Sequence, residues 1–413
     1  MDHSDRQRES LTVDEAVRRI LVRCGALPPR SISLRGARGL VLAVDIFARS
    51  HSPRFDTSAM DGYAVQAGDV RAASPAHPVQ LPVIGAIAAG AQSDLNVVAG
   101  TAVRIMTGAR CPAGTDAVVP LELVREQADR IEVTTPLPFG ANIRRTGEDI
   151  AEGSALLTIG ARLLPTHLAL LAAEGIESAT VIPRPRVAII ATGDEVVPPG
   201  QALEPGQIWD SNSAMVTGLV EQFGGDIMSS DLVPDEPVGL LAILRHRAAD
   251  GVDLILTVGG ASRGDRDVLA EIAGEGIAQD FWNVQMKPGR PLVFGVVDGV
   301  PLIGLPGNPA AAFVSAVQFL RPAIVAMLGR LDIVPPMVSA RVAESIPNPG
   351  GRRNYVRVKL DMDGSENTAR LAGPQNVANT LTLSKADGLL VIPGSMSQVE
   401  PGALLEVQVI REL

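Results

Sequence analysis

Cysteine, histidine and aromatic residues are all scarce in this chain of 413 residues. Its two cysteines, Cys24 and Cys111, form no CxxC pair, which argues against a disulfide framework or a thiolate zinc site and fits a reducing compartment. The five histidines lie far apart and show no HExxH spacing. Aromatic residues make up only 3% of the chain, so its cores must be built from Val, Ile, Leu and Ala.

The sequence also shows no targeting segment and no uninterrupted membrane span. Its first ten residues, MDHSDRQRES, are charged throughout, so no signal peptide is expected. The longest uncharged run, residues 299–320, is long enough to cross a bilayer, but LPGNP interrupts it, and lipid would leave irregular backbone without hydrogen bonds. The run therefore predicts a buried strand, a turn and a buried helix, in a cytoplasmic protein that binds no membrane.

A basic stripe is missing as well. The formal net charge of −10 argues against a nucleic-acid-binding protein, although a small anionic ligand could still bind in a locally basic or metal-bridged pocket. Neither the GxxxxGK(S/T) pattern of a Walker A loop nor a GxGxxG pattern occurs. The length, together with a hydrophobic content of 46%, predicts roughly two to four folded domains.

The pattern of apolar runs changes along the chain. Short or alternating apolar runs broken by Gly and Pro indicate a β-rich region, and strand and helix patterns alternate further on. Such alternation predicts a parallel or mostly parallel sheet that is covered on both faces. Four parts are expected: a helical linking domain of residues 1–50 and 149–183, a β-rich insertion of 51–148, an α/β domain of 184–332 and a C-terminal β domain of 333–413.

Two helix starts are recognisable in the linking domain. Thr12 and Glu15 have the spacing of a capping box at the start of an apolar stripe. Thr166 is the candidate N-cap of a second helix, which Gly175 would end.

Small, polar sequences follow three strands of the predicted α/β domain: ATGDE (191–195), TVGGASRGDRD (257–267) and LPGNPAA (305–311). Sheets of this kind bind ligands at the carboxyl ends of their strands. Glycines there let backbone N–H groups approach an anion, and a helix N-terminus adds the positive end of its dipole. Asn308 is a candidate N-cap with Pro309 at the first helical position. Singly, each segment is more often an ordinary strand-to-helix turn.

Charged side chains accompany these glycines. Several acids near an anion-binding loop suggest Mg²⁺ that bridges a phosphate or oxyanion to the protein, although N-capping and solvated loops are the alternatives. Lys287 and Arg290, in VQMKPGRP, suit phosphate or a molybdate-like oxyanion, unless they form a surface turn. The acids concerned are Asp194, Glu195, Asp235, Asp265 and Asp267.

Two segments of the β-rich insertion stand out. In SAMDGYAV (58–65), Asp61 and Gly62 form a tight-turn signal beside Tyr63, one of only two tyrosines. A hairpin corner is the plain interpretation. In RRTGEDI (144–150), Glu148 and Asp149 are candidates for a general acid and base or for metal ligands, and equally for a polar turn.

Taken together, these motifs resemble the MoeA family over nearly the whole chain. The resemblance is carried, in order, by SPRFDTSAMDGYAV, RIMTGARCPAGTDAVVPLE, RRTGEDI, IIATGDE, GQIWDSNS, GGASRGDRD, MKPGRP and LPGNPAA. That family comprises the bacterial molybdopterin molybdenumtransferases and the E-domains of gephyrin and plant Cnx proteins. It implies an elongated multidomain protomer, α/β plus β-rich, with a MogA-like doubly wound α/β domain, a β-rich insertion domain and a C-terminal β-barrel-like domain.

The resemblance also implies an activity and its partners. The substrates would be molybdate and adenylylated molybdopterin, and with Mg²⁺ the enzyme would hydrolyse the adenylate and insert molybdenum, giving molybdenum cofactor and AMP. It would act as a homodimer, with the active cleft between the α/β domain of one subunit and the β-rich domain of the other. A molybdopterin adenylyltransferase would be the upstream partner, and neither nucleic acid nor a membrane would be bound.

Residue by residue, the resemblance assigns roles to positions in this chain. Asp61 would reach across the dimer, with Tyr63 as part of its support. The catalytic positions would be Asp61, Thr107, Asp149, Glu195, Asp235, Asp267 and Lys287, of which Glu195, Asp235 and Asp267 would be metal ligands. The substrate-binding positions would be Gly259, Gly260, Ser262, Arg290, Pro306, Gly307, Asn308 and Arg353.

The chain departs from the family pattern at three places. The usual GGVSVGD loop reads GGASRGD, which places Arg263 at the pocket rim, and Asn283 stands where many members have a basic residue. A Gly-Ser pair near the C-terminus is replaced by QNV (375–377). Arg263 and Asn283 leave open a paralogue that stores or delivers the pterin, or a tungstate-specific insertase. A scaffold protein is a further alternative, because the gephyrin E-domain also clusters a receptor.

Overall fold

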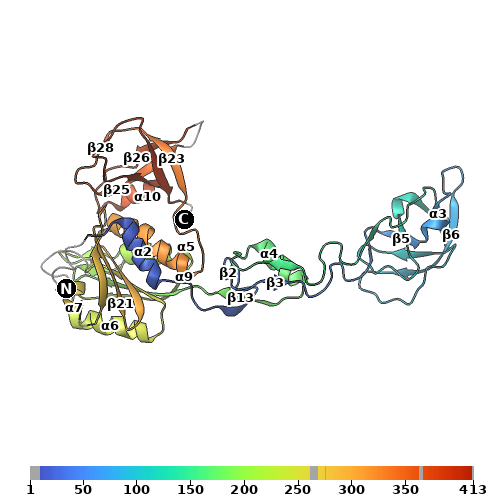
Figure 1. Ribbon diagram of the computed structural model, residues 1–413, viewed down its shortest axis with the longest axis horizontal. Coiled ribbons are helices and arrows are strands. Elements are labelled where there is room, and N and C mark those ends of the chain that lie inside the picture. The colour runs from blue at the N-terminus through green and yellow to red at the C-terminus, as the bar shows by residue number, and fades with distance from the viewer. Residues whose placement is uncertain (1–9, 261–267, 275, 362–365, 412–413) are drawn as a thin grey trace. The chain divides into compact units, whose positions relative to one another are not determined.

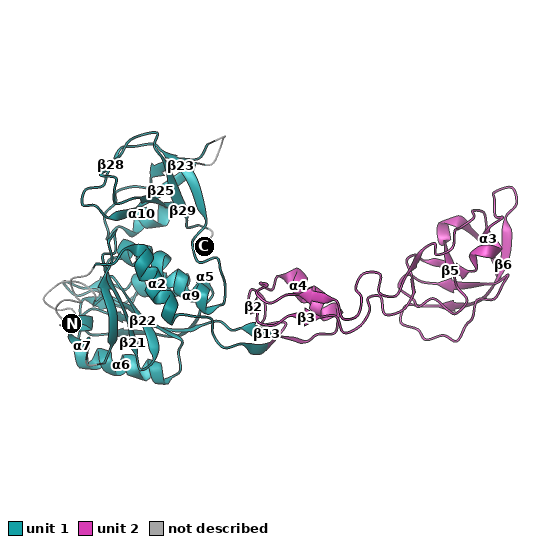
Figure 2. Cartoon of the chain, viewed as in Figure 1, with its two compact units in different colours: residues 1–31, 180–413 teal, residues 32–179 magenta. Residues whose placement is uncertain are grey.

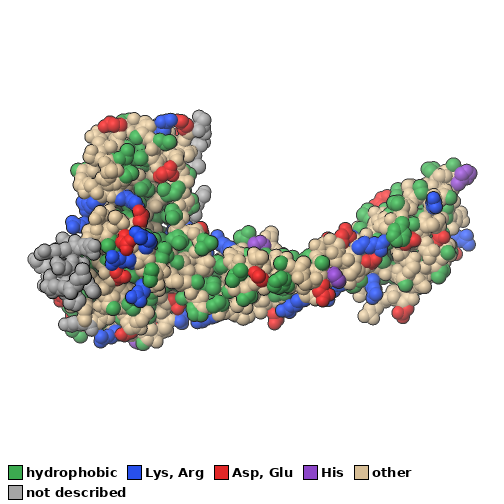
Figure 3. All heavy atoms as spheres, viewed as in Figure 1, with side chains coloured by type: hydrophobic (Ala, Val, Ile, Leu, Met, Phe, Trp, Pro, Cys, Tyr) green, Lys and Arg blue, Asp and Glu red, His purple; other side chains and the backbone are tan. Residues whose placement is uncertain are grey.

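The structure, a computed structural model, describes residues 10–260, 268–274, 276–361 and 366–411 (Figure 1). It divides into two compact units, unit 1 of Met1–Ser31 with Thr180–Leu413 and unit 2 of Ile32–Ala179 (Figure 2). The four domain ranges predicted from the sequence are finer than this division and stay predictions. On the face of the molecule shown in Figure 3, acidic and basic side chains are interspersed.

Within unit 1, residues 186–305 form a six-stranded sheet that confirms the predicted α/β class. Its first four strands are parallel, and β22–β21 and β21–β19 are antiparallel pairs, so the sheet is mostly parallel, as the alternating pattern predicts. The strand order is β17 (Asp226–Val233), β14 (Arg186–Thr192), β18 (Leu254–Val258), β22 (Val300–Leu305), β21 (Pro291–Val297) and β19 (Ala278–Asn283).

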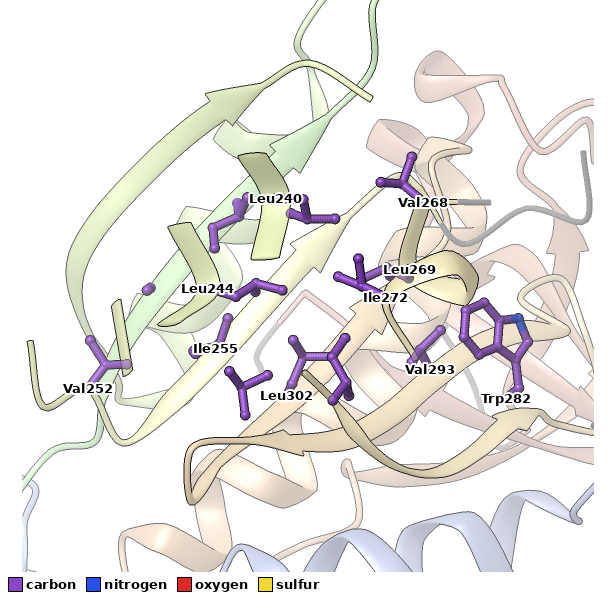
Figure 4. Packing of buried hydrophobic residues seen from close by; sticks show 14 residues of the cluster. Leu240, Leu244, Val252, Ile255, Val268, Leu269, Ile272, Trp282, Val293 and Leu302 are labelled. Carbon is purple, nitrogen blue, oxygen red and sulfur yellow. The ribbon is translucent and has the colours of Figure 1, made fainter. Parts of the chain in front are cut away.

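Helices cover both faces of this sheet. Helices α6 (Pro237–Ala249) and α7 (Val268–Ile272) bury Leu240, Leu244 and Leu269 against alternate residues of the strands, such as Ala188 and Ile190 (Figure 4). Because successive side chains of a strand point to opposite faces, the remaining residues of β14 serve the other layer. That layer contains α5 (Asn212–Phe223) and the helix that begins at Pro309.

The uncharged run of the sequence folds as predicted, into strand β22, a turn and a buried helix. The helix consists of α8 (Pro309–Ser315), a π-helical segment η2 (Ala316–Leu320) and α9 (Arg321–Met327). Pro309–Met327 is long and apolar enough to cross a membrane, yet 89% of that window is buried inside the protein. It therefore has the character of a core helix.

The N-terminal helix α2 (Val13–Arg23) packs against η2 and α9. The Thr12 hydroxyl accepts a hydrogen bond from the Glu15 backbone N–H at 3.2 Å, which confirms Thr12 as the N-cap. The other predicted N-cap, Thr166, is wrong. The N-cap is Leu164, two residues earlier, and helix α4 spans Pro165–Ala173 with proline at its first position, where the fixed φ of proline favours helix initiation.

The C-terminal part of unit 1 is a closed β-barrel, as predicted. Its strands close because β27 pairs with both β29 and β25, and Val356, Leu390 and Val407 lie in its core. The order is β25 (Arg353–Asp361), β26 (Thr368–Leu371), β23 (Met337–Val342), β29 (Leu404–Val409) and β27 (Gly388–Ile392). The remaining elements here are β20 (Met286–Lys287), which pairs with β25, the pair β24 (Ile346–Pro347) and β28 (Gln398–Val399), and α10 (Thr380–Lys385).

Unit 2 is β-rich, also as predicted, and Tyr63, Val119 and Ile131 lie in one of its two cores. Its main sheet has the order β8 (Ala117–Pro120), β5 (Gly62–Val65), β7 (Ala102–Ile105), β6 (Val79–Ile87), β10 (Arg130–Val133) and β9 (Val124–Gln127). Smaller pairs join β4 (Thr57–Ser58) to β11 (Ile143–Arg144) and β3 (Ile46–Phe47) to β12 (Ala155–Leu157). A third small sheet has the order β1 (Arg30–Ser33), β13 (Ser178–Ile182) and β2 (Val41–Leu42), and short helices are α3 (Ala67–Val70) and η1 (Leu121–Leu123).

We expect Leu240→Ala to destabilise the α/β domain, because Leu240 is fully buried between α6 and the sheet. Removing a buried Leu side chain costs about 2–5 kcal/mol of the free energy of unfolding. Urea unfolding followed by the fluorescence of Trp282, which lies in the same cluster, would measure it. The matched control is Val238→Ala on the same helix, since Val238 is 75% exposed and should change stability by less than about 0.5 kcal/mol. Equal effects of both variants would contradict this packing.

Candidate functional site

The three strand ends singled out in the sequence meet in one cavity of about 570 Å³ in unit 1. Strands β14, β18 and β22 are neighbours in the sheet and run parallel, so their carboxyl ends lie at the same edge. The cavity is lined by Ala191, Thr192, Gly193, Glu195, Val196, Ile208, Trp209, Asp210, Ser211, Asn212, Asp235, Val258, Gly259, Gly260, Gly307, Asn308, Pro309, Ala378 and Thr380.

Two of the lining glycines are required by the closeness of the strand ends. Gly259 has a φ of +96°, and a Cβ there would lie 2.5 Å from the Thr192 carbonyl oxygen. Gly260 has a φ of +62°, and its Cβ would lie 2.9 Å from the Thr192 hydroxyl. A side chain at either position would push β14 and β18 apart, so these glycines hold the cavity floor together and leave its backbone accessible.

Glu195 and Asp235 are the predicted metal ligands that the structure places in this cavity. The Asp235 backbone N–H donates to the Asp194 carboxylate at 3.1 Å, which draws these two acidic loops together. The Thr192 side chain lies within hydrogen-bonding reach of the Asp235 carboxylate, although neither the Thr192 hydroxyl nor the buried Asp235 Oδ1 forms a well-aligned hydrogen bond among the described residues. Burial, assisted by the negative charges of Asp194 and Glu195, raises the pKa of Asp235, while the Thr192 hydroxyl lowers it. A carboxylate in such a position is stabilised by a bound cation.

This donor set fits Mg²⁺. Within the described ranges, no group of three or more His, Cys, Asp or Glu side chains is placed to hold a metal. Mg²⁺ does not need one, because it is usually held by one or two carboxylates together with water and substrate phosphates. The presence of two carboxylates, Glu195 and Asp235, on one cavity is the observation that favours a cation at this point. The third predicted ligand, Asp267, lies outside the described residues, as do Ser262, Arg263 and Asp265.

A second, smaller cavity of about 240 Å³ is cationic and shares Gly307 and Asn308 with the first. Its lining includes the predicted residues Lys287, Arg290 and Pro306. Asn308 occupies the N-cap position before Pro309, as predicted, although its side chain makes no capping hydrogen bond. The larger cavity therefore carries acidic residues and the smaller one basic residues, on the two sides of Gly307 and Asn308. This arrangement suits an anionic ligand with a metal at one end.

Arg352 lines this second cavity, whereas the predicted Arg353 does not. The Arg353 guanidinium binds both carboxylate oxygens of Asp14, at 2.8 and 2.9 Å, so the structure brings it to helix α2 instead. Arg352 lies in the bend before β25, and Arg353 is the first residue of that strand, so the two consecutive arginines have different surroundings. The sequence does not show which of the two lines the cavity.

The C-terminal domain contributes a segment that sequence reasoning missed. The Val377 carbonyl accepts a hydrogen bond from the Ala310 backbone N–H at 3.0 Å, which joins this segment to the start of α8. Val377 lines the smaller cavity, and Ala378 and Thr380 line the larger one. The QNV sequence that departs from the family pattern therefore ends at a residue beside the site.

Asn283, the other departure, is not among the lining residues of either cavity. It is only 4% exposed, and its Oδ1 finds no hydrogen-bond partner among the described residues. Its backbone carbonyl accepts from the Leu11 N–H at 3.2 Å. This position therefore belongs to the contact between strand β19 and the N-terminal segment.

In unit 2, the structure brings together Asp61 and Thr107, two residues predicted separately. One Asp61 carboxylate oxygen accepts hydrogen bonds from both the backbone N–H and the hydroxyl of Thr107, each at 2.7 Å. These bonds lower the pKa of Asp61, so this exposed carboxylate is held in its charged form. Glycine at position 62 is required by packing and not by a turn, because a Cβ there would lie 2.0 Å from the Val119 carbonyl oxygen of strand β8.

Tyr63 does not support Asp61, contrary to the expectation. Its ring is buried in the core of unit 2, and its hydroxyl donates to Glu126 at 2.7 Å. Burial, reinforced by Glu126, raises the pKa of Tyr63 to about 12. The support that the resemblance assigned to this tyrosine is supplied by Thr107.

Asp149 and Glu148 lie on a loop of unit 2 that is closed by its own hydrogen bonds. Asp149 forms an ion pair with Arg144, and the Glu148 carboxylate accepts from the Arg145 backbone N–H at 2.8 Å. Asp56 accepts from the Arg145 guanidinium at 2.7 Å and from the Thr146 N–H at 2.8 Å. The loop is thus a polar turn, and the role of Glu148 and Asp149 as general acid and base or as metal ligands stays a prediction.

Comparisons with known proteins agree with this architecture. Residues 11–175 match the MoeA N-terminal region (domain I and II), residues 188–326 a probable molybdopterin binding domain, and residues 339–410 the MoeA C-terminal region (domain IV). The chain is 39% identical to molybdopterin molybdenumtransferase 2 of Mycobacterium tuberculosis, covering 96% of this chain and 98% of that protein. It is 32% identical to the molybdopterin molybdenumtransferase of Staphylococcus aureus, covering 97% and 96%.

A solved structure shows the same fold over the same length. The molybdopterin biosynthesis MoeA protein of Pyrococcus horikoshii matches with a TM-score of 0.82 and 29% sequence identity, covering 97% of this chain and 99% of that one. Sequence relatives over nearly the full length and a matching fold lead to one conclusion: the chain belongs to the MoeA family.

Proposed function

We propose that this protein is a molybdopterin molybdenumtransferase, which takes adenylylated molybdopterin and molybdate and gives molybdenum cofactor and AMP. The observation that carries the proposal is the joint cavity at the sheet edge, where acidic residues and glycine loops adjoin a cationic pocket. The near full-length similarity to proteins named for this activity supports it. The substrates carry phosphate and oxyanion charges, which need neutralisation by such groups.

The residues divide this work by their chemistry. The backbone at Gly259, Gly260 and Gly307 would approach the phosphates of the adenylylated substrate. Lys287, Arg290 and Arg352 would neutralise an oxyanion in the smaller cavity. Fixed cations and N–H groups of this kind stabilise charge without reorganising during the reaction.

Glu195 and Asp235 would hold Mg²⁺, with Asp267 as the third predicted ligand. When bound, the ion would supply positive charge that bridges the acidic rim and the substrate's phosphate oxygens. The protein's own part is to place the Glu195 and Asp235 carboxylates on the same cavity, with Thr192 as the hydroxyl next to Asp235. The raised pKa of Asp235 means that a proton competes for this carboxylate at low pH.

The predicted assembly supplies Asp61, Thr107 and Asp149 from a second copy of the chain. In this proposal the enzyme is a homodimer, and the β-rich unit of one subunit completes the cavity of the other. A cytoplasmic location and an adenylyltransferase that provides the substrate are further parts of the proposal. A tungstate-specific insertase would use the same residues, and only competition between the two oxyanions distinguishes it.

Reconstitution tests the proposed reaction. Purified protein, adenylylated molybdopterin, molybdate and Mg²⁺ should yield AMP and active cofactor, and removing Mg²⁺ with a chelator should stop AMP release. Glu195→Gln should lower the rate by about 10²-fold or more, since a charged ligand is lost where phosphate charge is stabilised. Glu221→Gln, an exposed acid on α5, is the matched control. Binding without turnover by the unaltered protein would favour a storage protein, and full activity of Glu195→Gln would refute the site.

Subunit complementation tests the shared site. Asp61→Asn and Glu195→Gln, each inactive alone, would be co-expressed with different tags and the mixed dimer isolated. One of its two sites would contain both wild-type residues, so we expect about half the wild-type rate per dimer. An inactive mixed dimer would place Asp61 and Glu195 in the same subunit's site, and a monomer on gel filtration would refute the dimer itself.

A titration of Asp61 tests the role of Thr107. Because its hydrogen bonds lower the pKa of Asp61, the Asp61 carboxylate stays charged to lower pH than the Asp235 carboxylate, whose pKa is raised. Thr107→Ala removes the hydroxyl bond, so the pKa of Asp61, followed by NMR of its carboxyl carbon, should rise, and Thr107→Ser should restore it. An Asp61 pKa that is the same in Thr107→Ala and in the wild type would show that Thr107 does not act through Asp61.

A further inference from the structure

Trp209 occupies an unusual place beside the larger cavity. It lies in β16 (Ile208–Trp209), a short strand that pairs in parallel with β15 (Val196–Val197). The Ile208 N–H donates to the Glu195 carbonyl and the Asp210 N–H to the Val197 carbonyl, both at 2.8 Å. These bonds fasten the strand to the segment that carries the proposed metal ligand Glu195, and Trp209 itself lines the cavity.

The side chain of Trp209 is both exposed and held. It is 52% exposed, although the chain has only two tryptophans and the other, Trp282, is buried. The indole Nε1–H donates to the Gln201 carbonyl at 2.8 Å, so its polar group is satisfied without a ligand. Such an arrangement restricts the ring and leaves aromatic surface available for stacking.

The residues that follow Trp209 connect strand β16 to helix α5 and to the loop at Gly307. The Asp210 carboxylate accepts from the Ser213 N–H at 2.9 Å, at the start of α5, and the Asn212 side chain donates to the Gly307 carbonyl at 2.6 Å. Trp209 is therefore connected, on both sides, to residues that line the same cavity. The position of its ring is coupled to the glycine loops, where the substrate's phosphates are proposed to bind.

The proposed substrate has a planar nitrogen heterocycle at each end, adenine on one side of its phosphates and pterin on the other. The cavity volume of about 570 Å³ lies within the usual range for small-molecule sites. We propose that Trp209 is a specificity-determining residue that stacks on one of these two rings and so positions the phosphates over Gly259 and Gly260. This inference rests on the proposed function and adds a binding role for a residue outside the predicted set.

Stacking of a base on an aromatic side chain contributes enough to be measured as an affinity. Trp209→Ala should weaken the binding of adenylylated molybdopterin, measured by equilibrium dialysis without Mg²⁺ and molybdate, by about 5- to 150-fold. Trp209→Phe should recover most of the affinity, because it keeps an aromatic face. Trp282→Phe is the matched control and should bind as the wild type. A wild-type dissociation constant for Trp209→Ala, with folding verified by circular dichroism, would overturn the proposal.

Fluorescence identifies which ring is bound. In Trp282→Phe, Trp209 is the only tryptophan, so a stacked ring should quench its emission. AMP and pterin are the two probes, and ribose 5-phosphate, which has no ring system of this kind, is the blank. Quenching by AMP places adenine on Trp209, and quenching by pterin places the other end there. If the complete adenylylated substrate binds to this variant without quenching, the stacking proposal is wrong.

The two proposals fail in different ways. If the wild-type protein binds the adenylylated substrate and Trp209→Ala binds it more weakly, but no AMP is released with molybdate and Mg²⁺, stacking stands and the transferase activity fails. If turnover is observed and Trp209→Ala keeps the wild-type affinity, the activity stands and stacking fails. A wild-type protein that does not bind this substrate at all overturns both.

Discussion

The parallel packing of β14, β18 and β22 is the constraint on which the site depends. Because these strands are adjacent, the loops that follow them converge at one sheet edge even though they lie far apart in the sequence. The Thr192 carbonyl lies so close to Gly259 that no Cβ fits between them. This close approach of two backbones requires glycine at position 259. The missing side chain also leaves the backbone N–H groups of the loop accessible to a ligand.

Electrostatics then separates the cavity edge into two regions. The acidic rim places Glu195 and Asp235 on one cavity, with Asp194 beside Asp235, a concentration of negative charge that a cation stabilises. The basic side places Lys287, Arg290 and Arg352 around a smaller cavity across Gly307 and Asn308. An anion with a bound divalent cation satisfies both regions together, whereas either ligand alone would satisfy only one.

Residues whose role depends on local geometry were predictable from the sequence. Thr12 caps its helix because its hydroxyl needs only the N–H three residues later, and the strand, turn and helix around Asn308 follow from apolar runs and a Pro-Gly-Asn-Pro break. Residues whose role depends on direction or tertiary contact were not. The sequence does not distinguish Arg352 from Arg353. The resemblance assigned Tyr63 to the support of Asp61, whereas the side chain of Tyr63 enters the core and its hydroxyl donates to Glu126. Trp209 and the segment at Val377 became visible only when the cavity brought distant strands together.

The two units of the chain prepare their functional groups independently. Asp61 receives both of its hydrogen bonds from Thr107, within unit 2, so it is charged and oriented without any contribution from unit 1. Glu195 and Asp235 are positioned by loops of unit 1 alone. Each set of side chains is therefore ordered within its own unit. In the proposed homodimer, binding energy from association would then serve orientation around the substrate instead of the ordering of side chains.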